Sequence, residues 1–220
     1  MAGSAQAHGL IRKRANKAMR RRRLCQRSER GLRELKQTTD VIYWDEFVHP
    51  AFEQRPLYIA ASDAGLCRIT WPSESFETLQ AWTAKHAPNA GLVRDERRMS
   101  GALLQLREYL EGERTAFDLS LDLKGTPFQV SVWRALVRIP YGETRSYSDI
   151  AASVDKPAAV RAVGAANGAN PVPIVVPCHR VIGKNTALTG FRGGLAVKEM
   201  LLQREGYREY KAAGHARFRF

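Results

Sequence analysis

The hydrophobic pattern changes its period at Gly125-Thr126-Pro127, and this change constrains the fold more than any other feature of the sequence. Before it, four apolar residues alternate with polar ones in the pattern of a half-buried strand. They are Phe117, Leu119, Leu121 and Leu123. After it, apolar residues recur at helical spacing and strand signals largely disappear. We therefore predict an α/β domain over residues 38–120, followed by a mostly helical domain over residues 121–220.

The α/β domain begins with strand-forming runs separated by turn residues. Residues 41–44, 57–60 and 66–71 have strand character, and residues 62–65 supply the turn chemistry between the last two. One helix is expected around Leu79 and Trp82. A second, amphipathic helix is expected where apolar residues recur at helical spacing, at Met99, Leu103, Leu106 and Leu110.

The second domain carries clear helix-start signals. Thr126 can cap a helix with Pro127 at its first position, and Ser146 can cap a short helix over residues 147–153. Pro157 is expected to open a third helix that runs toward Gly168. The last two helices form a helix-turn-helix candidate. The small side chains of the third helix suit either close approach to DNA or tight packing against a neighbouring helix.

Positive charge is concentrated at the N-terminus. The net charge is +13, and residues 1–37 carry twelve Lys and Arg against two acidic residues, while the remaining 183 residues carry 23 against 20. We expect residues 1–37 to form a flexible basic extension. Attraction to nucleic acid, a non-essential solvated segment and an import signal are all compatible with this composition.

The sequence also argues against several classes of protein. The three cysteines, Cys25, Cys67 and Cys178, are odd in number and form no CxxC pair, which disfavours a disulfide framework and a four-cysteine zinc site. At least one free thiol is expected. No apolar run approaches the roughly 20 residues that a membrane helix needs, and the N-terminus does not fit a secretory signal. We expect no metal and an intracellular protein.

Residues 170–183 contain the most informative chemical pattern. Three prolines within seven residues predict an extended, stiff segment that delivers Cys178 and His179 together. A free thiol has a pKa near 8.5, so only about 3% is thiolate at pH 7 unless a base or cation helps. His179 is the nearest base, although a water or a local turn would have to connect it to the thiol. For an isolated pair, a buried structural cysteine beside an incidental histidine would be the better interpretation.

This pair is part of a longer pattern. The run Pro177-Cys178-His179-Arg180-Val181-Ile182 resembles the active-site signature of the O6-alkylguanine-DNA alkyltransferases. The resemblance covers most of residues 125–207, and residues 38–120 match more loosely. It includes Arg161-Ala162-Val163-Gly164, Asn170-Pro171-Val172-Pro173, Gly193-Gly194-Leu195-Ala196-Val197-Lys198 and Glu205-Gly206. It implies a ribonuclease-H-like N-terminal domain followed by a winged-helix-like, DNA-binding catalytic domain.

The resemblance implies direct DNA repair without a cofactor. Cys178 would take the alkyl group from O6 of guanine as a thioether, irreversibly and once per molecule. His179 would draw the thiol proton through a water, and Glu205 would orient His179. Asn170 would fix the thiol, and Tyr147 would protonate the departing base. Whether O4-alkylthymine is also a substrate is left open.

The implied partner is double-stranded DNA that contains alkylated guanine, with the target base flipped into a pocket. Arg161 would fill the vacated space, while Ala159, Ala162 and Gly164 would allow close approach of the helix. Tyr147 is also expected to contact the DNA. Phe191 stands where relatives often have Tyr, which removes a hydroxyl contact. Arg192 is larger than the small residue of some relatives, which bears on the size of the pocket and of the adducts that it accepts. The implied pocket residues are Pro173, Val181, Phe191, Arg192 and Gly193.

Two other functions compete with alkyl transfer. A non-enzymatic lesion-binding protein of similar fold would lack the reactive cysteine, whereas Cys178 is present. A cysteine hydrolase would turn over, whereas a thioether is not hydrolysed and the reaction would stop after one equivalent. We expect a monomer in the cytoplasm, or in the nucleus if the source is eukaryotic.

Overall fold

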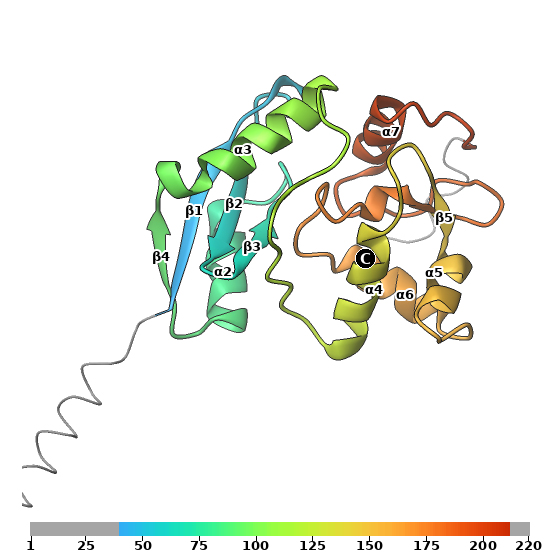
Figure 1. The fold of residues 1–220 in the computed structure, drawn as a ribbon, viewed down its shortest axis with the longest axis horizontal. Helices are drawn as coiled ribbons and strands as arrows, with labels where there is room; N and C mark the ends of the chain where they lie inside the picture. The colour runs from blue at the N-terminus through green and yellow to red at the C-terminus, as the bar shows by residue number, and fades with distance from the viewer. Residues whose placement is uncertain (1–39, 212–220) are drawn as a thin grey trace, which may run out of the picture. The chain divides into compact units, whose positions relative to one another are not determined.

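The computed structural model describes residues 40–211, which belong to one compact unit beginning at Asp40 (Figure 1). The predicted basic extension, residues 1–37, lies outside the described residues, and so does Cys25. None of the described helices is both long enough and apolar enough to cross a bilayer.

A four-stranded sheet forms the first half of this unit, in the order β3-β2-β1-β4. β1 and β2 pair antiparallel with Trp44 opposite Ala60, β2 and β3 also pair antiparallel, and β4 runs parallel to β1. The three predicted strands are confirmed, whereas β4 is a finding of the structure, because it is short and mostly exposed. The bounds are β1 (Val41–Phe47), β2 (Leu57–Ser62), β3 (Gly65–Ile69) and β4 (Gly91–Arg94).

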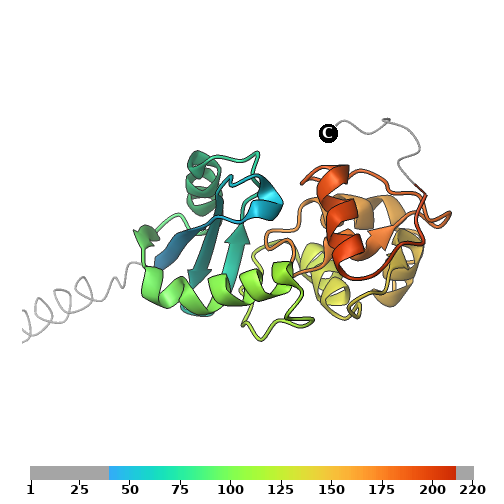
Figure 2. The same cartoon turned by 90° about the horizontal axis from the view of Figure 1, so that it is seen from above.

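Each face of the sheet is covered by one helix (Figures 1 and 2). Because side chains alternate along a strand, Ile42 and Ala60 face α2 (Phe76–His86), where they pack with Leu79. The opposite face packs against α3 (Glu96–Glu111). Both predicted helices are confirmed. A short 3-10 helix, η1 (Pro50–Phe52), joins β1 to β2.

The predicted strand over residues 117–123 is wrong. This segment makes a single bridge to the sheet, in which Leu66 N–H donates to Ser120 O and Asp122 N–H donates to Leu66 O. Its alternating apolar residues are half-buried between the sheet and the helices that follow. The alternation therefore reflects a connector that packs on one side, and the segment forms no further ladder with the sheet.

Helices form the second half of the unit. Thr126 and Gln129 form a capping box at α4, and Ser146 and Asp149 form another at α5, as their sequence signals predict. The Trp133 indole N–H donates to Ala166 O at 2.8 Å, which ties α4 to α6. The helices are α4 (Pro127–Val137), α5 (Tyr147–Ser153), α6 (Val160–Gly168) and α7 (Leu195–Arg204).

The start of α6 differs from the prediction. The helix begins at Val160, three residues after Pro157, because residues 157–158 form a turn and Ala159 N–H bonds to Lys156 O. The predicted helix-turn-helix is nevertheless formed by α5, the turn and α6.

The proline-rich segment is also not extended. Val176 N–H bonds back to Val172 O, and Ile174 adopts a positive φ of 76°, so the chain reverses before it reaches the cysteine. Residues Cys178–Arg180 then form a 3-10 helix, η2, which leads into β6 (Val181–Ile182) beside β5 (Arg145–Ser146). Cys178 and His179 therefore lie in a local turn, η2, and not in an extended segment.

Candidate active site

Cys178 and His179 occupy the first two positions of η2, at the buried centre of the helical half. Their exposed fractions are 3% and 0%. A 3-10 helix places successive side chains about a third of a turn apart, so adjacent residues do not point in opposite directions as they would in a strand. The fold thus removes the geometric objection that an extended segment would raise.

The His179 ring is held by Glu205 at the end of α7. His179 Nε2 lies 2.8 Å from Glu205 Oε1, and since an ionised carboxylate only accepts hydrogen bonds, Nε2 carries the proton. His179 Nδ1 is buried and has no hydrogen-bond partner among the described residues. Burial lowers the pKa of His179, and the Glu205 carboxylate offsets this only in part. The ring is therefore neutral, with a free lone pair on Nδ1.

Glu205 is surrounded by donors. Arg180 Nε donates to Oε2 at 2.9 Å, the Tyr109 hydroxyl donates to Oε1 at 2.5 Å, and Gly142 N–H donates to Oε2 at 3.1 Å. Burial by itself would raise the pKa of Glu205, but His179 and Arg180 outweigh it and lower this pKa to about 2. The carboxylate is therefore ionised throughout the physiological range.

The Cys178 thiol is protonated in the resting protein. Burial raises its pKa to about 11, against opposing influences from the Asn170 side chain, Lys198 and nearby backbone N–H groups. Because the thiolate is the nucleophile, the thiol needs a base at the moment of reaction. The neutral imidazole of the neighbouring His179 has the required protonation state, because its Nδ1 carries a free lone pair.

Asn170 fixes the turn that presents the cysteine. Its side-chain amide donates to Val176 O at 2.8 Å, and its carbonyl oxygen accepts from Val172 N–H at 3.0 Å. From α6, Asn167 donates to Cys178 O at 3.3 Å. Both asparagines are buried, so they satisfy backbone groups that the irregular turn leaves without ladder partners.

Tyr147, the first residue of α5, lies near the thiol. Its hydroxyl accepts from the Thr189 hydroxyl at 3.3 Å, and burial, followed by proximity to Cys178, raises its pKa. Tyr147 is thus a neutral proton donor in the resting protein. Gly164 of α6 faces this ring, since a Cβ there would lie 3.9 Å from it.

The predicted DNA-contact residues lie on the helix-turn-helix. Arg161 is exposed in the first turn of α6 and forms no ion pair with another described residue. Ala162 is exposed beside it, and Ala159 is half-buried at the N-cap position. The structure therefore places Arg161 on the surface, apart from the Cys178, His179 and Glu205 cluster.

A small cavity adjoins Cys178. Of the predicted pocket residues, Pro173, Phe191 and Arg192 line it, and Gly193 follows them in the same loop. Val181 is buried in β6, where its carbonyl accepts from Lys198 Nζ at 2.6 Å. The volume of about 10 Å³ has room for roughly one water molecule, so the cavity does not hold a purine in this conformation.

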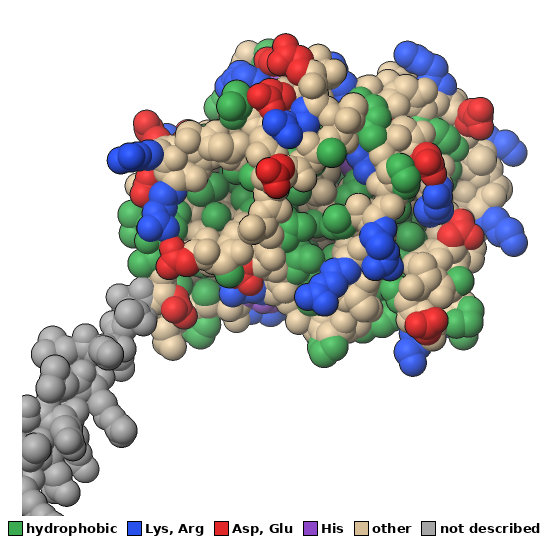
Figure 3. All heavy atoms as spheres, in the orientation of Figure 1, with side chains coloured by type: hydrophobic (Ala, Val, Ile, Leu, Met, Phe, Trp, Pro, Cys, Tyr) green, Lys and Arg blue, Asp and Glu red, His purple; other side chains and the backbone are tan. Residues whose placement is uncertain are grey.

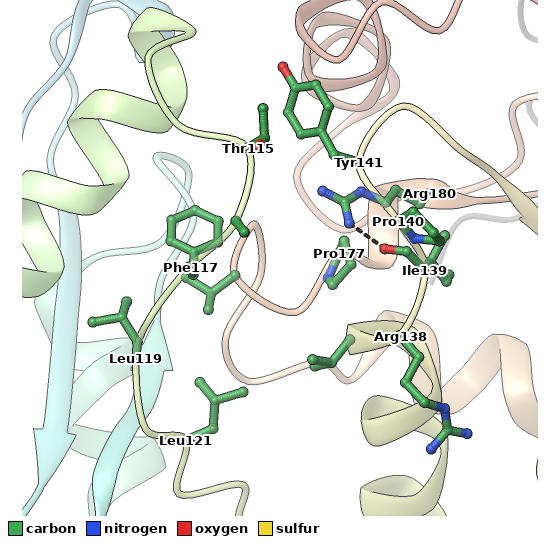
Figure 4. Close-up of a pocket in the computed structure, with 13 residues that line it drawn as sticks. Thr115, Phe117, Leu119, Leu121, Arg138, Ile139, Pro140, Tyr141, Pro177 and Arg180 are labelled. Atoms are coloured by element: carbon green, nitrogen blue, oxygen red, sulfur yellow. Dashed lines mark hydrogen bonds between the residues drawn. The ribbon is translucent and has the colours of Figure 1, made fainter.

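A larger hollow lies between the connector and the end of α4 (Figures 3 and 4). Its lining is mainly apolar, with Phe117, Leu119 and Leu121 on one side and Ile139 on the other. Arg180 reaches it, but its Nη1 donates to Ile139 O and its other nitrogens bind Glu205. The second arginine of the lining, Arg138, is exposed and forms no ion pair with another described residue, and the hollow does not contain the thiol.

Three residues of the centre carry no role in the sequence prediction. Tyr109 lies in the first half of the chain, and Arg180 belongs to the recognised motif without an assigned partner. Lys198 is buried, with a pKa lowered by burial to about 8. The signal for Arg180 and Lys198 is a long cation inside an apolar run. Tyr109 has the spacing of an ordinary core residue on α3. No group of His, Cys, Asp and Glu suited to a metal ion occurs among the described residues.

Comparison with known proteins assigns the family. The model described as "6-O-methylguanine DNA methyltransferase, DNA binding domain" matches residues 127–207, and the ribonuclease-like domain of the same protein matches residues 52–123. The chain belongs to the 6-O-methylguanine DNA methyltransferase family. The family models confirm the predicted ribonuclease-H-like domain and the DNA-binding domain that follows it.

Relatives of this methyltransferase cover most of its length. The "Methylated-DNA--protein-cysteine methyltransferase, inducible" of Bacillus subtilis is 48% identical over 164 residues, 74% of this chain and 90% of the relative. The crystal structure of the Mycobacterium tuberculosis O6-methylguanine methyltransferase aligns with a TM-score of 0.64 and 42% identity, covering 75% and 93% of the two chains. The M. tuberculosis protein in complex with DNA aligns equally well, over 74% and 92%.

Proposed function

We propose that this methyltransferase repairs DNA by moving the alkyl group of O6-alkylguanine to Cys178, once per protein molecule. The observation that carries the proposal is the ring of His179, the residue that follows Cys178, whose Nε2 is bound to Glu205 while the buried Nδ1 has no hydrogen-bond partner among the described residues. The relatives named for methylated DNA and for cysteine support the same chemistry.

In the proposed reaction, His179 Nδ1 removes the Cys178 proton through an intervening water. The thiolate sulfur attacks the alkyl carbon, the bond from that carbon to O6 breaks, and the electron pair stays with the guanine. Tyr147 supplies a proton to the departing base, so that neutral guanine is released. Glu205 stabilises the imidazolium that forms, with Arg180 holding the carboxylate in place.

We propose double-stranded DNA with an alkylated guanine as the partner, bound through the helix-turn-helix. The alkyl carbon is stacked inside the duplex, so the nucleotide has to be flipped out, which costs a few kcal/mol. The exposed Arg161 supports a role in filling the vacated space. All groups of the relay come from one chain, which supports action as a monomer. A DNA substrate supports a cytoplasmic location, or a nuclear one in a eukaryote.

The decisive experiment is mass spectrometry of intact protein and peptides after incubation with a duplex containing one O6-methylguanine. We expect one methyl group per protein, located on Cys178. Cys178→Ser should abolish transfer, whereas Cys67→Ala, which removes the other buried free thiol of the described residues, should preserve it. DNA binding without methyl transfer would favour a lesion-binding protein, and repeated turnover would favour a hydrolase.

A further inference from the structure

The loop over residues 189–194 closes the cavity at Cys178 by packing against the sheet half of the protein. Trp71, just beyond β3, is 2% exposed and meets the Phe191 ring edge to face, with centroids 5.2 Å apart. A Cβ placed on Gly193 would lie 2.8 Å from the Trp71 indole. The loop backbone therefore rests directly on this tryptophan.

An ion pair fastens the same loop. The Arg192 guanidinium binds the Glu74 carboxylate, which lies in the turn immediately after Trp71. Glu74 is itself held firmly, because it also pairs with the buried Arg68 at 3.2 Å and accepts the Trp71 N–H at 2.8 Å. The side chain of Glu74 is 13% exposed and that of Arg192 is 39% exposed. The acidic partner is thus anchored in the sheet half, and the arginine is the exposed end of the contact.

Closure of the loop is incompatible with a bound base. Trp71, Phe191 and Arg192 line the cavity that contains Cys178, and this cavity has room for roughly one water. A purine is many times larger, so the loop has to move away from Trp71 and Glu74 before a flipped base enters. The alkyl group, which Cys178 attacks, has to lie at the thiol end of that space, so a bulkier alkyl group requires a wider opening.

We propose that Glu74 and Trp71 are specificity-determining residues, which limit the size of the alkyl group by holding the loop through Arg192 and Phe191. The inference rests on the proposed function. It assigns a role in substrate selection to the turn over residues 71–74, which lies outside the helical domain that carries the thiol. A benzyl adduct requires the loop to move further from Glu74 than a methyl adduct does. The Arg192–Glu74 ion pair opposes the larger movement more strongly, so it favours methyl over benzyl adducts.

The test compares transfer rates from O6-benzylguanine and O6-methylguanine in the same duplex sequence, so that changes in DNA affinity cancel in the ratio. In Arg192→Gln the benzyl-to-methyl ratio should rise about two- to fivefold, the range that a partly exposed ion pair supports. Glu74→Gln should raise it similarly, and the double variant should add little to either single change. Arg98→Gln is the matched control, since it removes an exposed arginine from its pair with Asp63 and should leave the ratio unchanged.

Glu74→Gln also leaves the buried Arg68 without its anionic partner, so its folding is checked by circular dichroism. If it unfolds, Arg192→Gln decides alone, because that change leaves the Arg68–Glu74 pair intact. A wild-type ratio in the folded variants would overturn the inference while leaving the proposed function standing. If no cysteine of the wild-type protein becomes methylated, both the inference and the proposed function are overturned.

Discussion

The Tyr109 hydroxyl donates a 2.5 Å hydrogen bond to Glu205 Oε1, the same oxygen that lies 2.8 Å from His179 Nε2. Tyr109 belongs to α3, which covers the sheet, whereas Glu205 ends α7 in the helical half. The carboxylate that binds the His179 ring is therefore positioned partly by the other half of the chain.

Tyr109→Phe should slow methyl transfer roughly three- to tenfold, because a hydrogen bond to a charged group is worth about 1.5–3 kcal/mol and only part of it acts through the base. With one donor lost, Glu205 attracts the His179 proton more strongly, which raises the pKa of His179. The neutral ring is then lost at a higher pH, so the acidic limb of the rate profile should move to higher pH. Single-turnover rates between pH 5 and 9 measure both effects.

Tyr141→Phe is the control for that measurement, since the Tyr141 hydroxyl donates to Arg204 O and not to Glu205. It should leave the position of the acidic limb unchanged. Equal profiles for Tyr109→Phe and the wild type would reduce Tyr109 to a packing residue.

Glu205→Gln should destabilise the fold by about 3–5 kcal/mol at pH 7, because it leaves the buried Arg180 charge unpaired. The pKa of Glu205 is about 2 in the folded protein against an ordinary 4.5, so its ionised form stabilises the fold above about pH 4.5, and this stabilisation is lost as the pH falls toward 2. Urea unfolding should show the gap between variant and wild type narrowing over that interval. In the control Glu143→Gln, which breaks an exposed pair with Arg145, the change should stay below about 1 kcal/mol.

The resting thiols should react slowly with iodoacetamide at neutral pH. Burial raises the pKa of Cys178 to about 11 and that of Cys67 to about 12, so the thiolate fraction of each should grow about tenfold per pH unit between pH 7 and 9. Peptide mass spectrometry separates the sites. A rate for Cys178 that does not change with pH over this range would mean that the thiol is already ionised.

Arg161→Ala should slow repair of duplex DNA much more than reaction with free O6-benzylguanine, because the free base needs no flipping. Arg97→Ala removes an exposed arginine of α3 and should change neither rate. Equal losses on both substrates would exclude Arg161 from flipping.

Deletion of residues 1–37 should leave transfer chemistry intact and weaken DNA binding, because the segment carries twelve of the 35 Lys and Arg residues. The dependence of affinity on salt should become shallower as phosphate contacts are lost. Binding measured at several salt concentrations tests this, and an unchanged slope would show that the segment does not contact phosphate.

Predictions of secondary structure from local sequence signals are the most reliable ones for this chain. The capping residues Thr126 and Ser146 predict the starts of α4 and α5 because their hydrogen-bond partners lie three residues away. The prediction that α6 begins at Pro157 is wrong, because a proline that suits the first turn of a helix suits a preceding turn equally well. Ile174 shows the same limit, since its positive φ is imposed by contacts around the turn and not by its own side chain.

The residues of the candidate active site also fall into two groups, those that the sequence predicts and those that only the structure shows. Cys178, His179 and Glu205 follow from a resemblance in linear sequence, and the structure brings His179 and Glu205 together. Tyr109 and Glu74 follow from no sequence pattern, because their partners lie 96 and 118 residues away. Contacts across such separations depend on how the sheet half packs against the helical half, which hydrophobic periodicity does not specify.

The contact between α3 and α7 has a consequence for a protein that is consumed by its own reaction. Cys178 reacts only once in each molecule. A chain whose Cys178 reacted with another electrophile before folding was complete could no longer repair DNA. The Tyr109 hydroxyl can donate to Glu205 only when the sheet half has packed against the helical half. The hydrogen bonds around Glu205 and His179 are therefore complete only in the folded protein. Assembly of the two halves thus completes the hydrogen bonds of Glu205 and at the same time protects the thiol, because burial raises the pKa of Cys178 to about 11, whereas the exposed thiol of an unfolded chain keeps a pKa near 8.5 and reacts more readily.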